Sequence, residues 1–103
     1  MAIKLFIFGT GTLSDVAFHY FSNDAKFKVV GFVEYKKFLK KRKKNNLPVV
    51  EFEKIKKVFP KKEFQGFVAV GYKSMNAYRE KIFKSLKKLG YKFINVDNLL
   101  KFI

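Results

Sequence analysis

The sequence predicts a small α/β domain with a mostly parallel sheet, and three observations support this fold class. Apolar runs that end at glycine or turn residues alternate with stretches whose apolar residues recur at helical spacing. The first apolar run is nearly continuous, as is typical of a strand covered on both faces. Alternation of strands and helices favours parallel strands joined by right-handed crossovers. With 103 residues in the chain, we expect one domain over residues 1–103.

The first third of the chain predicts a strand, a glycine turn, a helix and a second strand. The strand is expected at Ile3–Phe8, and the turn follows at Gly9–Thr12. Apolar residues then recur at helical spacing over Leu13–Phe21. A second apolar, β-prone run follows at Lys28–Glu34. This succession is a βαβ unit.

The rest of the chain continues the alternation after a basic segment, Tyr35–Asn46, that ends in a predicted Asn-Asn turn. In chain order we expect a strand at Leu47–Val50, a short helix at Glu51–Val58, a strand at Gly66–Gly71, a helix at Ser74–Leu89 closed by Gly90, and a strand at Lys92–Val96. The predicted architecture is three-layered, with about five mostly parallel strands in the order 3-2-1-4-5.

The composition excludes several classes of protein and site. There is no Cys, so a disulfide framework, a thiolate nucleophile and a Cys-based metal site are excluded, and a single His excludes a His-pair metal motif. The apolar runs are far shorter than the roughly 20 residues that span a bilayer, and no signal peptide is visible. We therefore expect a cytoplasmic protein without a metal or a cofactor.

The charge is strongly positive, with 23 Lys and Arg against 8 Asp and Glu, a net charge of +15. Only Arg42 and Arg79 are arginines, whereas specific readers of nucleic acid depend on arginine to match guanine edges and phosphates. The bias toward Lys, Phe and Asn is typical of an AT-rich genome. We expect non-specific, salt-sensitive binding of polyanions, and nucleic acid stays an alternative partner.

The glycine turn Phe8–Asp15 has the pattern of a phosphate-binding loop. Gly9 and Gly11 match the first two glycines of G-x-G-x-x-G, and Ser14 stands at the third position. The first glycine permits a tight turn, and the second lets a phosphate approach the helix N-terminus. A small residue at the third position allows the helix to pack closely on the strand. The turn therefore predicts a Rossmann-like ligand site, with a ligand-free tight turn as the alternative.

Two further groups extend this candidate site. Glu34 ends the second strand, where a carboxylate accepts hydrogen bonds from a ribose hydroxyl; the alternative is an ordinary solvated Glu. The loop Gly71–Asn76 is expected to face the glycine turn across the crevice between strands one and four. In that crevice Lys73 and Arg79 would contact a phosphate, Asn76 would donate a hydrogen bond, and Tyr72 would stack. Alternatively, Arg79 is an exposed residue that pairs with Glu80 or Glu63.

No catalytic centre is predicted. His19 is the one conventional base at neutral pH, and Asp15 lies four residues earlier, so the two are expected to form an ion pair on the helix surface. Asp15 also stands three residues after Thr12, the expected N-cap, in a capping-box-like pair. No nucleophile elbow, catalytic triad or carboxylate cluster accompanies them.

The run Lys36–Lys44 permits two interpretations. It could dock on nucleic acid, anionic lipid or an acidic partner. We favour a solvated loop between strands two and three, because Phe38 and Leu39 alone interrupt the charges.

The residues of this chain resemble a known family over roughly Lys4 to Val96. The matching segments are Phe6–Gly11, Val29–Phe32, Leu47–Val50 and Phe67–Asn76, together with Arg79 and Gly90-Tyr91. They look like the N-terminal nucleotide-sugar-binding domain of bacterial sugar O/N-acyltransferases of the sialic-acid O-acetyltransferase and pilin-glycosylation type. The resemblance implies a Rossmann-like domain that holds a UDP- or dTDP-linked sugar for surface-glycan biosynthesis.

The resemblance also implies which residues bind the ligand, since in such families the glycine turn and the acidic residue after the second strand contact the nucleotide. The candidate nucleotide-sugar-binding residues are Gly9, Thr10, Gly11, Thr12, Leu13, Glu34, Gly71, Tyr72, Lys73, Asn76 and Arg79.

The sequence departs from the family pattern in two places. The glycine turn has fewer glycines and lacks the family's His. The chain ends at Asp97–Ile103, where a β-helix of hexapeptide repeats with the catalytic His and the acyl-CoA site would begin. We expect no acyl transfer by this chain alone. It is expected to be either a stand-alone or truncated form of the binding module, or a domain that works with a separate acyltransferase chain. The other functional hypotheses are a scaffold with an empty crevice and, least favoured, a dinucleotide oxidoreductase.

Overall fold

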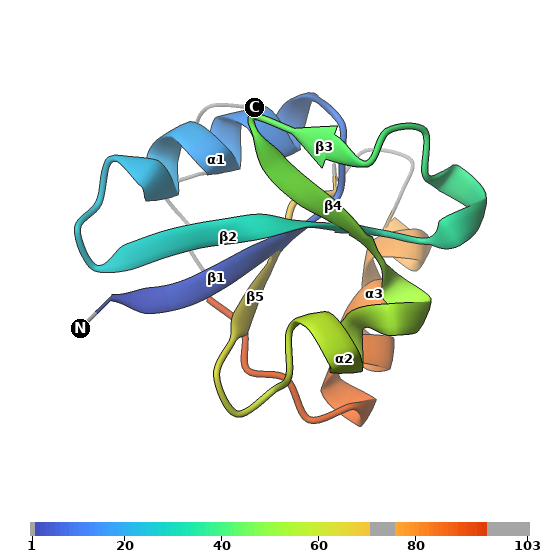
Figure 1. The fold of residues 1–103 in the computed structure, drawn as a ribbon. Coiled ribbons are helices and arrows are strands. Elements are labelled where there is room, and N and C mark those ends of the chain that lie inside the picture. Colours follow the sequence, from blue (N-terminus) through green and yellow to red (C-terminus); the bar gives the residue numbers. More distant parts are fainter. Residues whose placement is uncertain (1, 71–75, 95–103) are drawn as a thin grey trace.

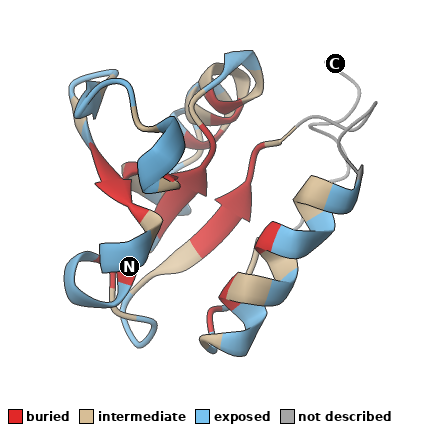
Figure 2. Cartoon of the chain, turned by 90° about the vertical axis from the view of Figure 1, so that its right-hand side faces the viewer, coloured by how far each residue is buried: buried red, intermediate tan, exposed pale blue. Residues whose placement is uncertain are grey.

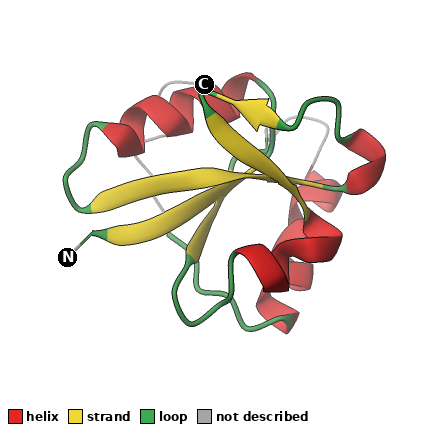
Figure 3. Cartoon of the chain, in the orientation of Figure 1, coloured by secondary structure: helices red, strands yellow, loops and turns green. Residues whose placement is uncertain are grey.

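Three layers make up the molecule, with a twisted sheet between helices on its two faces (Figure 1). The computed structural model describes residues 2–70 and 76–94. Helix α1 (Thr12–Ser22) covers one face of the sheet. Helices α2 (Ile55–Val58) and α3 (Asn76–Lys88) lie on the opposite face (Figure 3). The predicted three-layer α/β fold class is confirmed.

The sheet has five strands in the order β3-β4-β2-β1-β5. Four of them are parallel: β1 (Ile3–Phe8), β2 (Phe27–Glu34), β4 (Leu47–Glu51) and β5 (Gln65–Val68). The fifth, β3 (Lys43–Lys44), pairs antiparallel with β4 at one edge. Two short 3-10 helices, η1 (Lys36–Phe38) and η2 (Phe52–Lys54), follow β2 and β4.

The predicted order of the four parallel strands is confirmed. At the edge predicted for the fifth strand, Lys92–Val96, Phe93 forms a parallel bridge to Gly66 of β5. The Gly66 N–H donates to the Lys92 carbonyl at 3.0 Å, and the Ile94 N–H donates to the Gly66 carbonyl at 2.9 Å. The last two residues of this predicted strand lie outside the described residues. Strand β3, at the opposite edge, was not predicted, and the basic segment supplies it.

The central strands are buried along much of their length, while the helices carry exposed residues on their outer sides (Figure 2). Successive side chains of these strands belong alternately to two core clusters, one on each face of the sheet. On β1, Leu5 and Ile7 pack with Ala17 and Phe21 of α1. The intervening Phe6 and Phe8 join the other cluster, whose helical members are Ile55, Ile82 and Leu86. All four β1 side chains are fully buried. Because both faces are covered, β1 reads as a continuous apolar run.

The beginning of α1 corrects one prediction. The helix N-cap is Gly11, Thr12 is the first helical residue, and no side chain caps the end. The capping-box pair of Thr12 with Asp15 is therefore wrong, because the Asp15 carboxylate is bound to residues of the β3–β4 turn. Ser14, at the third glycine position, is fully buried, and its hydroxyl donates to the Gly11 carbonyl oxygen.

The end of α3 confirms another prediction. Gly90 has φ +91°, its N–H donates to the Lys87 carbonyl, and the Tyr91 N–H donates to the Leu86 carbonyl. These two hydrogen bonds form a Schellman motif, which needs a residue with positive φ at the position of Gly90. It turns the chain so that Tyr91 enters the core, where its hydroxyl donates to the Phe59 carbonyl at 2.6 Å.

Candidate functional site

The candidate site lies at the carboxyl edge of the parallel strands, where the glycine turn joins β1 to α1. The Gly9 N–H donates to the Val33 carbonyl of β2 at 2.9 Å, and the Ala69 N–H, just after β5, donates to the Phe8 carbonyl at 2.8 Å. The turn is thus held between the ends of two neighbouring strands. This edge is where open α/β sheets bind ligands.

The two glycines of the turn have different roles. Gly9 is buried with φ +126°, and a Cβ there would lie 2.6 Å from the Ala69 carbonyl oxygen. Gly11 is exposed, has φ −90°, and has nothing within 4 Å of the Cβ position. Gly9 is therefore required for packing, while Gly11 leaves open space at the start of α1. A phosphate group can approach backbone N–H groups through such an opening.

Glu34 lies directly beside this turn. Its side chain is buried at the end of β2, with 9% of the residue exposed. The Thr10 hydroxyl donates to Oε2 at 3.1 Å, and the Tyr35 N–H donates to Oε1 at 3.0 Å. Glu34 is therefore not the solvated surface residue of the alternative interpretation. Each carboxylate oxygen has accepted one hydrogen bond and keeps capacity for another.

The basic segment folds back toward the glycine turn as a β-hairpin. Asn45 and Asn46 have φ values of 52° and 63°, and they connect β3 to β4. Two consecutive positive φ angles are typical of the type I′ turns that join antiparallel strands, and Asn tolerates them better than most residues. The predicted Asn-Asn turn is confirmed. The expected solvated loop is present at Lys40–Arg42, which are exposed, whereas Lys36–Phe38 form η1 and Lys43–Lys44 pair with β4.

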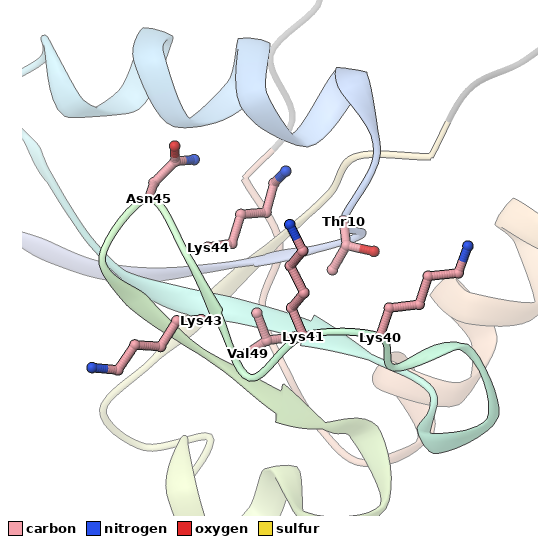
Figure 4. Close-up of a pocket in the computed structure, with 7 residues that line it drawn as sticks. All are labelled: Thr10, Lys40, Lys41, Lys43, Lys44, Asn45 and Val49. Carbon is pink, nitrogen blue, oxygen red and sulfur yellow. The ribbon is translucent and has the colours of Figure 1, made fainter.

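A pocket of about 400 Å³ lies between this hairpin and the glycine turn. Figure 4 shows the side chains that line it, which are Thr10, Lys40, Lys41, Lys43, Lys44, Asn45 and Val49. Lys41 and Lys44 point toward the side of Thr10 and α1, whereas Lys43 points away. The pocket therefore combines an apolar floor at Val49 with several ammonium groups.

Asp15 joins the tip of the hairpin to α1. Its carboxylate forms an ion pair with the Lys44 ammonium at 2.9 Å and accepts a hydrogen bond from the Asn45 amide at 3.3 Å. The hydrogen bond from Lys44 is the main cause that lowers the pKa of Asp15 below 3.8, and His19 contributes the least. The expected pair of Asp15 with His19 is replaced by these contacts with Lys44 and Asn45, the latter 30 positions away in the sequence. We call the two contacts the Asp15 clasp.

A second, more apolar pocket of about 570 Å³ lies on the α3 face near the same strand ends. Its lining includes Tyr35, Tyr78, Glu53 and three lysines. The Tyr78 ring packs against Tyr35 at 6.1 Å and against the half-exposed Phe38 at 6.2 Å. Burial, followed by the nearby Glu34 charge and then Tyr35, raises the pKa of Tyr78 to about 12.

The remaining predicted residues have separate positions. Thr12 is exposed, and Leu13 is half-buried against the α1-side core. Arg79 is half-buried with its guanidinium 5.0 Å from the centre of the Phe83 ring. Asn76 begins α3. Gly71, Tyr72 and Lys73, with the side chain of Asn76, lie outside the described residues.

The sequence offered Lys36–Lys44 as a possible docking segment, but it did not indicate that these lysines lie beside the glycine turn or that Asp15 contacts Lys44 and Asn45. A signal for the hairpin was present, since an Asn-Asn pair between two short β-prone runs is typical of a two-residue hairpin turn. No local pattern could show that the hairpin reaches α1.

The described part of the chain has neither a metal-binding cluster nor a membrane-spanning helix. Across residues 2–70 and 76–94, no three His, Asp or Glu side chains come together as a metal site would require. In that same part of the chain, no helix has the length and apolar character needed to cross a membrane.

Comparison with solved structures supports a Rossmann-type fold. UDP-D-quinovosamine 4-dehydrogenase from Vibrio fischeri superposes with a TM-score of 0.77 at 18% identity, over 98% of this chain and 85% of that one. RSP, a Rex-family repressor, superposes with a TM-score of 0.64 at 19% identity, over 93% of this chain and 47% of that one. At such identities the likeness concerns the fold.

Comparison by sequence gives the family. No curated protein matches this chain. The model of the PglD N-terminal domain matches residues 4–86, which includes the glycine turn, Glu34, the basic hairpin and most of α3. The match covers most of the chain and agrees with the segments that carried the resemblance in the sequence. The chain therefore belongs to the PglD N-terminal domain family.

Proposed function

We propose that this chain binds a nucleotide sugar, UDP- or dTDP-linked, at the carboxyl edge of the sheet. The observation that carries the proposal is the position of Glu34, a buried carboxylate hydrogen-bonded to Thr10 of the glycine turn at 3.1 Å. In this proposal Glu34 accepts a hydrogen bond from the ribose, and the glycine turn beside it binds the phosphate. These are the two groups that a Rossmann-like site uses for a nucleotide.

The chemistry of the residues fits the two parts of a nucleotide. Glu34 keeps lone pairs for a ribose hydroxyl after its bonds to Thr10 and Tyr35. The open side of Gly11 gives a phosphate access to the N-terminus of the eleven-residue helix α1. Free N–H groups and the positive end of the helix dipole favour an anion there.

The comparisons support a ligand that carries a sugar. The chain belongs to the PglD N-terminal domain family. The resemblance noted in its sequence is to the nucleotide-sugar-binding domain of sugar acyltransferases in glycan biosynthesis. The dehydrogenase with a similar fold is named for a UDP-linked sugar. In this proposal the domain holds the sugar nucleotide, and a separate acyltransferase chain in the cytoplasm carries out the transfer.

Calorimetric titration with UDP- and dTDP-sugars at moderate salt tests the proposal. We expect saturable binding by the wild-type chain and its loss in Gly11→Val, whose side chain would fill the opening used by the phosphate. This variant should keep the fold, because the Cβ position meets no atom within 4 Å and φ is −90°. Its circular dichroism spectrum and melting temperature check that.

Two results would overturn the proposal. One is the absence of saturable heat with any nucleotide sugar at millimolar concentration. The other is unchanged binding by a folded Gly11→Val variant.

A further inference from the structure

We infer that the pocket between the β3–β4 hairpin and the glycine turn is a diphosphate site, with Lys40 and Lys41 as its main cations. This inference rests on the proposed function and names the residues that hold the ligand's diphosphate. The sequence pointed instead to Lys73 and Arg79 on the other side of the crevice. The basic hairpin supplies cations on the side of β4, where none was expected.

The lining of the pocket favours a phosphate-rich anion. Four lysines and the Asn45 amide surround about 400 Å³ of space, and no carboxylate lines it. The Thr10 hydroxyl donates its hydrogen bond to Glu34, so it offers a ligand only its oxygen lone pairs as an acceptor. Cationic donors must therefore come from the lysines. The N-terminus of α1 begins two residues after Thr10 and adds its positive dipole end to the same side.

The lysines differ in their availability to a ligand. Lys44 is engaged by Asp15 at 2.9 Å, and its side chain is 21% exposed. Lys40 and Lys41 are exposed, and within residues 2–70 and 76–94 no ion pair joins either to a carboxylate. Lys41 points toward the side of Thr10 (Figure 4). Two ammonium groups beside one turn suit a diphosphate better than a single phosphate.

The Asp15 clasp holds the hairpin in a fixed position beside the glycine turn. By holding Lys44 and Asn45, Asp15 fixes the hairpin tip against α1 while using only one of the pocket's cations. The hairpin is further anchored by the Val49 N–H, which donates to the Arg42 carbonyl at 2.9 Å. Lys40 and Lys41 directly precede this anchored stretch, so their backbone is held near the turn before a ligand arrives. Preorganisation of this kind lowers the entropic cost of binding.

Pyrophosphate is the probe that separates this site from the nucleotide contacts. We compare the wild-type chain with Lys40→Gln/Lys41→Gln and with the matched control Lys28→Gln/Lys57→Gln. Both double variants carry the same net charge, and Lys28 and Lys57 are exposed residues away from the pocket lining. Titrations of pyrophosphate, of a UDP-sugar and of a single-stranded oligonucleotide are followed by calorimetry at two salt concentrations.

We expect pyrophosphate to bind the wild-type chain and to compete with the UDP-sugar. The Lys40/Lys41 variant should lose about 10-fold or more in affinity for both, as expected when charge-assisted hydrogen bonds are removed. The control should keep the wild-type affinity for both. Phosphorus NMR of pyrophosphate gives an independent measure of the same loss.

Three results would overturn the inference, and none requires the proposed function to fail. Equal weakening in both double variants would mean that only the total charge matters. Undiminished UDP-sugar binding by the Lys40/Lys41 variant, with loss in Gly11→Val, would place the diphosphate elsewhere in a genuine nucleotide site. An oligonucleotide that binds more tightly than pyrophosphate, with the same dependence on Lys40 and Lys41, would show that the pocket binds nucleic acid.

A different result would separate the site from the proposed function. Pyrophosphate binding that depends on Lys40 and Lys41, without any nucleotide-sugar binding, would support the site and reject the proposed function.

Discussion

The Thr10 hydroxyl donates a 3.1 Å hydrogen bond to the Glu34 carboxylate, and so joins two residues that lie 24 positions apart. One belongs to the glycine turn after β1, and the other ends β2. Since the two strands are parallel neighbours, their carboxyl ends meet at one edge of the sheet. The bond ties the expected phosphate loop to the expected ribose acceptor and fixes the Glu34 carboxylate in one orientation.

Thr10→Val should reduce the free energy of unfolding by about 1 to 2 kcal/mol, because it removes a hydrogen bond to a buried carboxylate and keeps the side-chain shape. Urea denaturation measures the change. Thr12→Val is the matched control, since Thr12 is exposed and forms no side-chain bond to the helix end. An equal loss in both variants would contradict a specific contribution of the Thr10–Glu34 bond.

Gly9→Ala should destabilise the protein by about 2 to 4 kcal/mol, the combined effect of backbone strain and overpacking. The φ of +126° is unfavourable for alanine, and the new Cβ would approach the Ala69 carbonyl oxygen to 2.6 Å. Chemical denaturation of Gly9→Ala and Gly11→Ala side by side tests this. Because Gly11 has open space around it, its variant should change stability by less than about 1 kcal/mol. Similar losses at both positions would be inconsistent with this geometry.

Asp15→Asn should weaken the clasp between α1 and the hairpin in a pH-dependent manner. The pKa of Asp15 is lowered in the folded state, so its stabilising contribution is present above pH 3.8 and is lost as the pH falls through the folded-state value. At neutral pH and low salt we expect a difference of about 0.5 kcal/mol from the wild type, since the pair is partly exposed. Denaturation at several pH values measures it. A difference that persists unchanged in strong acid would argue against an ionic clasp.

Tyr78→Phe should remove a tyrosinate titration step near pH 12. Burial raises the pKa of Tyr78 to about 12, so the neutral phenol is favoured in the folded state. Its contribution to stability is present below pH 10 and is lost as the pH rises through about 12. Ultraviolet absorbance of tyrosinate during an alkaline titration follows the step. Tyr20→Phe is the control, since it removes one tyrosine from the other face of the sheet. It should leave the step near pH 12 unchanged.

Much of the fold was readable from local patterns. The run Ile3–Phe8 is apolar at every position but one, because β1 is covered on both faces, and the structure gives the strand the same bounds. Gly90 was recognisable as the end of α3 because the closing motif needs a positive φ. The edge strand β3 was not foreseen, since Lys43 and Lys44 form a strand only by pairing with β4, and two lysines have no β-prone pattern of their own.

The sequence by itself determined the parallel α/β fold, the glycine turn and the acidic residue at the end of β2, because each of these has a local cause: side-chain periodicity, glycine geometry or strand position. Only the tertiary structure decided where the lysine run lies. Whether Lys40–Lys44 lies in solvent or faces the glycine turn depends on the neighbouring position of β4 and β2 and on the contact of Asp15 with Lys44 and Asn45. A charge pattern contains no information about such a distant contact, because it forms only when the sheet order brings the two segments together.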